Sequence, residues 1–166
     1  MHGKVATEMS EPVKYVKDGI SETDGMPRQG WSSDINFEIS VEINSVDDIV
    51  TARQEGRSLA KSLGFSSTEA TLIATAISEL ARNILLYART GEIVLSKVIN
   101  GQRIGIIIIG KDEGPGILNL VHAMMSGYST SGGLGLGLPG VKKIMDSFDI
   151  VSEHGLGTTV TTIMWL

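Results

Sequence analysis

The sequence contains no cysteine, only 4 prolines, and 5% aromatic residues among its 166 positions. Without cysteine the chain forms no disulfide and offers no thiolate as a metal ligand or nucleophile. Long apolar runs are also missing, since the longest, Ile104 to Ile109, contains Gly105 and is far shorter than the roughly 20 residues that span a bilayer. Charged residues interrupt every candidate signal-peptide core near the N-terminus. We therefore expect a cytoplasmic protein with no membrane segment.

Basic charge is scarce as well. The chain has 14 Lys and Arg against 19 Asp and Glu, for a formal net charge of -5. Because binding to nucleic acid requires clustered positive charge to neutralise phosphates, we expect no nucleic-acid partner. The 42% hydrophobic content suits a single domain with one core.

The first part of the chain differs from the rest. Residues 1–34 mix charge, Gly and Ser with few periodic apolar positions, which predicts a flexible N-terminal extension. Residues 35–166 are predicted to form one domain. From Ile35 to Ile43 apolar and polar residues alternate, as in a half-buried strand. Ser45 then precedes a helical pattern over residues 46–63, and Gly64 can end that helix.

A second helix is predicted to begin at Ser66, which has capping-box spacing with Glu69, and to run to about Arg89 and close at Gly91. Two β-rich runs then flank Asn100-Gly101, a pair typical of a tight antiparallel hairpin. The later expected elements are helices over 117–125 and 138–146 and strands over 148–153 and 158–165, after hairpin strands over 92–99 and 103–110. This order predicts an α+β fold, a two-layer α/β sandwich with a mixed, mostly antiparallel sheet and helices on one face.

Glu79 and Asn83 are the first candidate site residues. They lie four residues apart on the second predicted helix, so their side chains project from the same face. Carboxylate and amide oxygens suit Mg²⁺, which proteins usually hold together with waters and substrate phosphates. The alternative is an exposed polar pair on an amphipathic helix.

A second candidate motif, Asp112-x-Gly114-x-Gly116, directly follows an apolar strand. A buried carboxylate there can accept a hydrogen bond from an amino group, and the glycines let a flat ring approach the backbone closely. A simple turn is the alternative.

The third motif is the glycine-rich run that leads into Pro139, with glycines at Gly133, Gly135 and Gly137. Backbone amides that converge at the start of a helix form a phosphate cradle without any basic side chain. A flexible linker is the alternative.

Other nucleotide motifs do not fit. The spacing Gly135-x-Gly137-x-x-Gly140 matches the dinucleotide fingerprint, but that fingerprint requires a strand immediately before it, and residues 127–133 contain no apolar run. A Walker A pattern and a His-Arg-Asp catalytic loop are both absent from the sequence. Near the C-terminus, the hydroxyl of Thr158 could reach a bound base, or Gly157-Thr158-Thr159 could be an ordinary hairpin turn.

Taken together and in this order, the four motifs resemble those of the GHKL ATPase and kinase superfamily over residues 35–166. Two segments of the sequence are similar to those of the anti-sigma-factor serine kinases, and within that group to the stressosome switch kinases. They are Glu-Leu-Ala-Arg-Asn and Gly-Leu-Gly-Leu-Pro-Gly-Val-Lys-Lys-Ile-Met-Asp. The resemblance implies a Bergerat fold that binds ATP and Mg²⁺.

The resemblance also implies a role for each site residue. Glu79 would be the catalytic general base toward a Ser or Thr hydroxyl. The implied binding residues are Asn83 on Mg²⁺, Asp112 on the adenine amine, Gly114 and Gly116 beside the base, Gly133, Gly135 and Gly137 at the phosphates, and Thr158 helping to hold the base. Residues 117–137 would form an ATP lid, which here contains no Lys or Arg. Arg82 or Lys142 could supply that charge, or Arg82 could form a structural ion pair with Glu79.

The implied function is that of a serine/threonine protein kinase whose partners are STAS-domain proteins of a stressosome or anti-sigma pathway. The kinase would phosphorylate them, be sequestered by them, and after release activate a downstream signalling enzyme such as a phosphatase. Three alternatives stay open: an anti-sigma factor that sequesters a sigma factor directly, a detached histidine-kinase domain, and an ATP-gated interaction module without catalysis.

Overall fold

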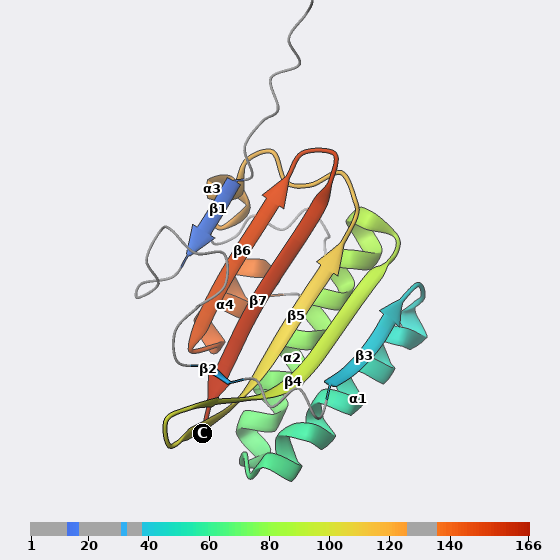
Figure 1. The fold of residues 1–166 in the computed structure, drawn as a ribbon. Helices are drawn as coiled ribbons and strands as arrows, with labels where there is room; N and C mark the ends of the chain where they lie inside the picture. The colour runs from blue at the N-terminus through green and yellow to red at the C-terminus, as the bar shows by residue number, and fades with distance from the viewer. Residues whose placement is uncertain (1–12, 17–30, 33–37, 126–135) are drawn as a thin grey trace, which may run out of the picture.

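The computed structural model describes residues 13–16, 31–32, 38–125 and 136–166 (Figure 1). The strands are β1 (Val13–Val16), β2 (Trp31–Ser32), β3 (Glu38–Ile43), β4 (Gly91–Asn100), β5 (Arg103–Asp112), β6 (Ser147–Glu153) and β7 (Gly157–Trp165). The helices are α1 (Val46–Leu63), α2 (Ser67–Asn83), the π-helix η1 (Ile84–Ala88), α3 (Leu120–Ala123) and α4 (Gly137–Ile144).

The strands form one sheet with the order β1-β6-β7-β5-β4-β2, and β3 also pairs with β4. Figure 1 shows α1, α2 and α4 together on one face of this sheet. The predicted α+β sandwich is confirmed. Every strand pair within the described residues is antiparallel, so the parallel component of the expected mixed sheet is not seen there.

Local capping determines where the first two long helices begin. The Asp48 carboxylate accepts hydrogen bonds from the backbone N–H of Ser45 at 2.8 Å and from its hydroxyl at 2.9 Å. At α2 the Ser66 hydroxyl accepts from the Glu69 backbone N–H at 3.2 Å, while the Glu69 carboxylate accepts from the Ser66 N–H at 2.8 Å. These bonds satisfy backbone donors that have no partner inside the helix. Both predicted helix starts are confirmed.

The end of α2 differs from the prediction in type. The helix continues beyond Asn83 as η1, a π-helix, and Arg89 then has a left-handed backbone with φ 70. Gly91 does not close the helix, because it is already the first residue of β4. A Cβ atom there would meet the backbone oxygen of Lys111 on the neighbouring strand, so the close pairing of β4 and β5 requires glycine.

The hairpin of β4 and β5 is formed as predicted. Its ladder runs from Gly91 opposite Asp112 to Asn100 opposite Arg103, and Gly101 in the turn has φ +60. This φ is the conformation that tight hairpin turns require and that glycine adopts readily. The hairpin places Asp112 at the end of the sheet where the chain turns away.

Two strands fall within the predicted N-terminal extension. β1 pairs with the edge of β6, and β2 pairs with the end of β4. Edge strands offer unpaired backbone groups to an extended segment nearby, which accounts for these two pairings. The flexible N-terminal extension predicted for residues 1–34 stays a prediction. The domain boundary near residue 34 stays a prediction.

The C-terminal elements follow the predicted order. α3 is shorter than the predicted 117–125 helix and begins after Asn119, whose side chain accepts from the backbone N–H of His122 at 2.9 Å. α4 begins at Gly137, one residue before the prediction, with Pro139 in its first turn. β6 and β7 form the predicted antiparallel pair.

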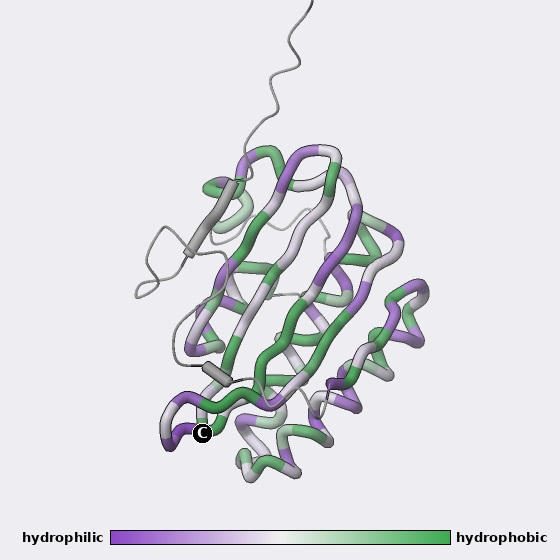
Figure 2. Tube along the Cα trace, in the orientation of Figure 1, coloured by the Kyte–Doolittle hydropathy of each residue, from purple (hydrophilic) through white to green (hydrophobic). Residues whose placement is uncertain are grey.

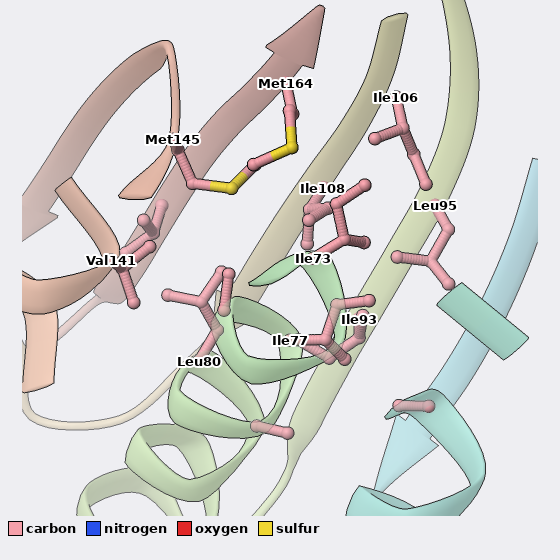
Figure 3. Packing of buried hydrophobic residues seen from close by; sticks show 14 of the residues in the cluster. Ile73, Ile77, Leu80, Ile93, Leu95, Ile106, Ile108, Val141, Met145 and Met164 are labelled. Atoms are coloured by element: carbon pink, nitrogen blue, oxygen red, sulfur yellow. The ribbon is translucent and has the colours of Figure 1, made fainter. Parts of the chain in front are cut away.

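The core lies between α2 and the centre of the sheet. Figure 3 shows Ile73, Ile77 and Leu80 of α2 against side chains of the central strands. The residues that surround them come from the strands, from α4 and from its C-cap, and include Ile93, Leu95, Ile106, Ile108, Val141, Met145 and Met164. Figure 2 shows the same concentration of hydrophobic residues along β4 and β5. This packing fixes α2 on the sheet, so that Glu79 and Asn83 are carried on a rigid support. No helix in the described part of the chain is long and apolar enough to cross a membrane.

Candidate functional site

A cavity of about 290 Å³ opens between α2, the ends of β5 and β7, and the first turn of α4. Its lining residues come from segments far apart in the sequence: Glu79, Leu80, Arg82, Asn83, Ile84, Tyr87, Gly110, Asp112, Pro115, Gly116, Ile117, Ala123, Gly137, Leu138, Thr158 and Val160. Most of the wall is apolar, with a few polar groups among the lining residues. Such a cavity suits a ligand with a flat apolar part and a charged part.

Glu79 lies at one end of this cavity, on α2, and only 7% of the residue is exposed. One carboxylate oxygen, Oε1, accepts a hydrogen bond from Arg82 Nη1 at 2.7 Å. The other oxygen, Oε2, accepts from the backbone N–H of Gly137 at 3.2 Å. Gly137 is the first residue of α4, so Glu79 connects α2 to the N-terminus of a second helix.

Asp112 lines the same cavity and is the last residue of β5. Its Oδ1 accepts from the backbone N–H of Gly114 at 2.9 Å. Burial raises the pKa of the Asp112 carboxyl, and backbone hydrogen bonds from Gly114 and Thr158 only partly oppose that effect. A half-buried acceptor with an incomplete set of donors is suited to bind an amino group.

The glycines after Asp112 are required by close packing. Gly116 has φ +74, and a Cβ atom there would meet the backbone carbonyl of Glu153. A Cβ on Gly114 would lie 2.6 Å from the Cβ of Ala88 in η1. The loop therefore fits tightly between β6 and η1, and this fit keeps the backbone beside the cavity in one place.

Thr158 is held by a residue that the sequence reasoning missed. The Ser152 hydroxyl, on a residue 1% exposed, lies 2.9 Å from the Thr158 hydroxyl and accepts from the backbone N–H of Ile117 at 2.8 Å. The ladder places Ser152 directly opposite Thr158. Ser152 thus orients Thr158 and fixes the start of the segment after Gly116. Its only sequence signal is a serine at a position of β6 that alternation assigns to the interior.

The structure brings most of the predicted residues together. Glu79, Asn83, Asp112, Gly116 and Thr158 line one cavity, as does Gly137. Gly114 adjoins it through its bond to Asp112. Gly133 and Gly135 lie outside the described residues. Arg82 lines the cavity, whereas Lys142 is not among its lining residues.

The donor set near Asn83 fits a metal that is held largely by a ligand. Within the described ranges no group of three or more His, Cys, Asp or Glu residues is able to hold a metal ion by itself. Mg²⁺ is usually bound by one or two protein oxygens plus waters and phosphates, so a single amide oxygen in a phosphate-sized space fits it.

Comparison with known proteins identifies the family. The model of the histidine kinase-, DNA gyrase B-, and HSP90-like ATPase family matches residues 68–166, and the chain belongs to this family. ATP is therefore the nucleotide that this class of domain uses. The matched region contains α2, the central sheet, η1 and all the lining residues named above.

A close relative is the serine/threonine-protein kinase RsbT of Bacillus subtilis (strain 168). It is 50% identical over 132 residues, which are 80% of this chain and 99% of the relative. More distant is an anti-sigma F factor of Bacillus cytotoxicus, 29% identical over 105 residues, covering 59% of this chain and 70% of the relative. These relatives confirm the predicted class, a kinase domain of this family related to the anti-sigma-factor kinases.

A solved structure supports the fold. The crystal structure of the RsbU and RsbW domains of Rv1364c from Mycobacterium tuberculosis matches 77% of this chain with a TM-score of 0.51 and 19% sequence identity. The match spans 31% of that longer chain. At this level of identity the likeness concerns the fold alone.

Proposed function

We propose that this chain is a Mg-ATP-dependent serine/threonine kinase that phosphorylates STAS-domain proteins and switches partners in a cytoplasmic stress-signalling pathway. The observation that carries the proposal is the cavity itself. A buried carboxylate, Glu79, a neighbouring amide, Asn83, and a half-buried acceptor, Asp112, all line it. The 50% identity to a serine/threonine-protein kinase over nearly the whole of that relative supports the same reaction.

The two ends of the cavity suit the two ends of ATP. Asp112 accepts the hydrogen bond of the adenine amino group, while Gly116 lets the ring lie against the backbone and Thr158 bonds the base. At the other end the amide of Gly137 and the N-terminus of α4 face the phosphates. Asn83 would hold Mg²⁺ there, and a bound ion would supply neutralisation of the charge on the transferred phosphoryl group.

Glu79 is the proposed general base. The side-chain oxygen of a partner Ser or Thr forms a bond to the terminal phosphorus, its proton passes to the Glu79 carboxylate, and the bond between that phosphorus and the bridging oxygen of ADP breaks. ADP leaves with the electron pair of the broken bond. Glu79 is placed for this step because it stands on α2 one turn from Asn83, at the end of the cavity where the phosphates lie.

The chemistry of the site does not select the protein substrate. STAS-domain proteins are the proposed partners because the regulatory relatives are similar throughout the matched region. A downstream enzyme such as a phosphatase is the proposed target of the released kinase. The second candidate is an anti-sigma factor kinase that sequesters a sigma factor directly, which the similarity to an anti-sigma F factor favours.

The test is a capture experiment. The purified chain is incubated with a lysate of its source cell, washed, and supplied with labelled Mg-ATP, and the bound proteins are identified by mass spectrometry. Glu79→Gln serves as the matched control, because it keeps the size of the side chain and removes the base. A STAS-domain protein phosphorylated on Ser or Thr only by the wild type supports the proposal. Capture of a sigma factor supports the second candidate, and capture without phosphorylation contradicts the kinase assignment.

A further inference from the structure

The carboxylate of Glu79 is held from two directions, and the two bonds are different in kind. Oε1 bonds the guanidinium of Arg82 at 2.7 Å, a charged contact within α2. Oε2 bonds the backbone N–H of Gly137 at 3.2 Å, a longer contact to another element. Both bonds are made to the carboxylate, but only the Arg82 bond joins two opposite full charges, and it is also the shorter one. The Arg82 bond is therefore the stronger one, and the Gly137 bond is the one that a ligand at the α4 N-terminus displaces first.

Burial makes the partner of Glu79 necessary. The Glu79 side chain is 9% exposed, whereas that of Arg82 is 44% exposed. A carboxylate with so little water contact is stable only when charged or polar groups compensate for the lost hydration. Arg82 is the basic partner that the structure shows for it, and Arg82 keeps much of its own hydration.

The bond between Arg82 and Glu79 also fixes the orientation of the Glu79 carboxylate. Glu79 has three rotatable side-chain bonds, and ordering such a side chain costs conformational entropy. With Oε1 held by a residue three positions further along the same helix, the carboxylate has one orientation, and Oε2 then faces the N-terminus of α4. This is the place where the proposed function requires the terminal phosphate.

We propose that Arg82 is the positioning residue of the general base: it holds Oε1 of Glu79 so that Oε2 stays directed at the phosphate end of the cavity. The inference rests on the proposed function and adds a role that the motif spacing does not assign. Arg82 acts through Glu79. When the phosphates take the Gly137 N–H, Oε2 is released toward the incoming hydroxyl while Oε1 remains fixed.

Two other roles for Arg82 make different predictions. As a structural ion pair with one partner nearly half exposed, it would contribute little to stability and nothing specific to catalysis. As a direct phosphate ligand, it would contribute to ATP affinity whether or not Glu79 is present. A positioning residue instead affects kcat, only when Glu79 can act as base, and leaves nucleotide affinity nearly unchanged.

The experiment is a double-mutant cycle with Arg82→Met and Glu79→Gln, together with Arg82→Lys. Arg57→Met is the control, an exposed arginine of α1 outside the cavity lining. For each variant we would measure kcat and KM for ATP on the captured substrate protein, the Kd of a non-hydrolysable ATP analogue, and the melting temperature. The rate of Glu79→Gln is read at high enzyme concentration.

We expect Arg82→Met to lower kcat about 10- to 100-fold, the usual cost of a misplaced catalytic group, with the analogue Kd within about threefold of wild type. Arg82→Lys should recover part of the loss, because an ammonium group also bonds Oε1. In the Glu79→Gln background Arg82→Met should cause no further loss of kcat.

Three results overturn the inference. An unchanged kcat in Arg82→Met would mean that Arg82 acts only as the structural ion-pair partner of Glu79. A weaker analogue Kd in both backgrounds would make Arg82 a phosphate ligand, and additive losses of kcat would separate it from Glu79. If the wild type itself transfers no phosphate to any captured protein, the proposed function fails instead, which is a distinct outcome.

Discussion

Two neighbouring loops, one of them beside the proposed adenine site, each contain a glycine, and comparing the two glycines isolates the effect of close packing. Gly116 has φ +74, and Gly155 has φ +78, so alanine at either position is in the left-handed region. A Cβ at Gly116 would meet the backbone carbonyl of Glu153, whereas nothing lies within 4 Å of a Cβ at Gly155. The two loops are joined by a hydrogen bond from the Gly155 N–H to the Pro115 carbonyl at 2.9 Å. Gly155→Ala is therefore a matched control for Gly116→Ala.

The expected magnitudes follow from this difference. Both alanines have the left-handed cost of about 1–2 kcal/mol. For a domain of this size, each kcal/mol lowers the melting temperature by about 2–4 °C. Gly116→Ala should lose about 1–3 kcal/mol more, the ordinary cost of overpacking, because the obstacle is backbone that cannot rotate away. Since the loop forms a wall of the cavity, its displacement should weaken ATP binding about tenfold or more, which corresponds to about 1.4 kcal/mol.

Thermal melts and titration with a non-hydrolysable ATP analogue test this reasoning. Gly155→Ala should melt a few degrees lower and bind the analogue as wild type does. Gly116→Ala should melt lower still and bind weakly. Equal losses of affinity in both variants, or full affinity in Gly116→Ala, would refute the claim that the close approach to Glu153 places the cavity wall.

Three further predictions concern the polar residues of the cavity. Glu79→Gln should reduce phosphate transfer by about 10²- to 10⁴-fold in a labelled-ATP assay while still binding the analogue, and a rate near that of wild type would contradict the general-base role. Asn83→Ala should remove the Mg²⁺-dependent part of ATP affinity in titrations with and without the ion, and an unchanged difference would place the metal elsewhere. The third prediction concerns Asp112, because burial raises the pKa of its carboxyl in the folded protein above the pKa in the unfolded chain. The contribution of this group to stability is therefore fully present at a pH below the unfolded pKa, and it is lost as the pH rises through the folded pKa. The free energy of unfolding of Asp112→Asn relative to wild type should therefore increase from about pH 4 to pH 7 in urea titrations, and a constant difference would show that burial does not shift this group.

The parts of the fold that the sequence predicted are those determined locally. The helix starts at Ser45 and Ser66 depend on side chains within three residues, and the turn at Gly101 depends on one dipeptide. By contrast, Ala88 of η1 packs against Gly114, which is more than twenty positions away in the sequence. The local sequence pattern therefore does not predict the change from α-helix to π-helix.

The candidate site shows the same division. Glu79, Asn83, Asp112 and Thr158 were identified because each belongs to a short motif, and the structure places them around one cavity. Ser152 was not identified, because its contact with Thr158 depends on the strand register that places the two residues opposite each other. Register is a property of two strands together. The bond from the Gly137 N–H to Glu79 spans 58 positions and is equally invisible to spacing.

The π-helix after Asn83 has a consequence for the chain lengths that this protein tolerates. A π-helix bonds each residue to the fifth one along, one more than an α-helix does. A π-helical turn holds one residue more than an α-helical turn, so deleting one residue of Ile84–Ala88 would let the segment become α-helical while β4 keeps its place, and Tyr87 would move within the cavity wall. At Gly101, by contrast, an inserted residue would change the turn type that sets the register of β4 and β5. A relative with one residue fewer between Asn83 and β4 is therefore expected to have an α-helix there, whereas the length of the hairpin turn is fixed by the strand pairing.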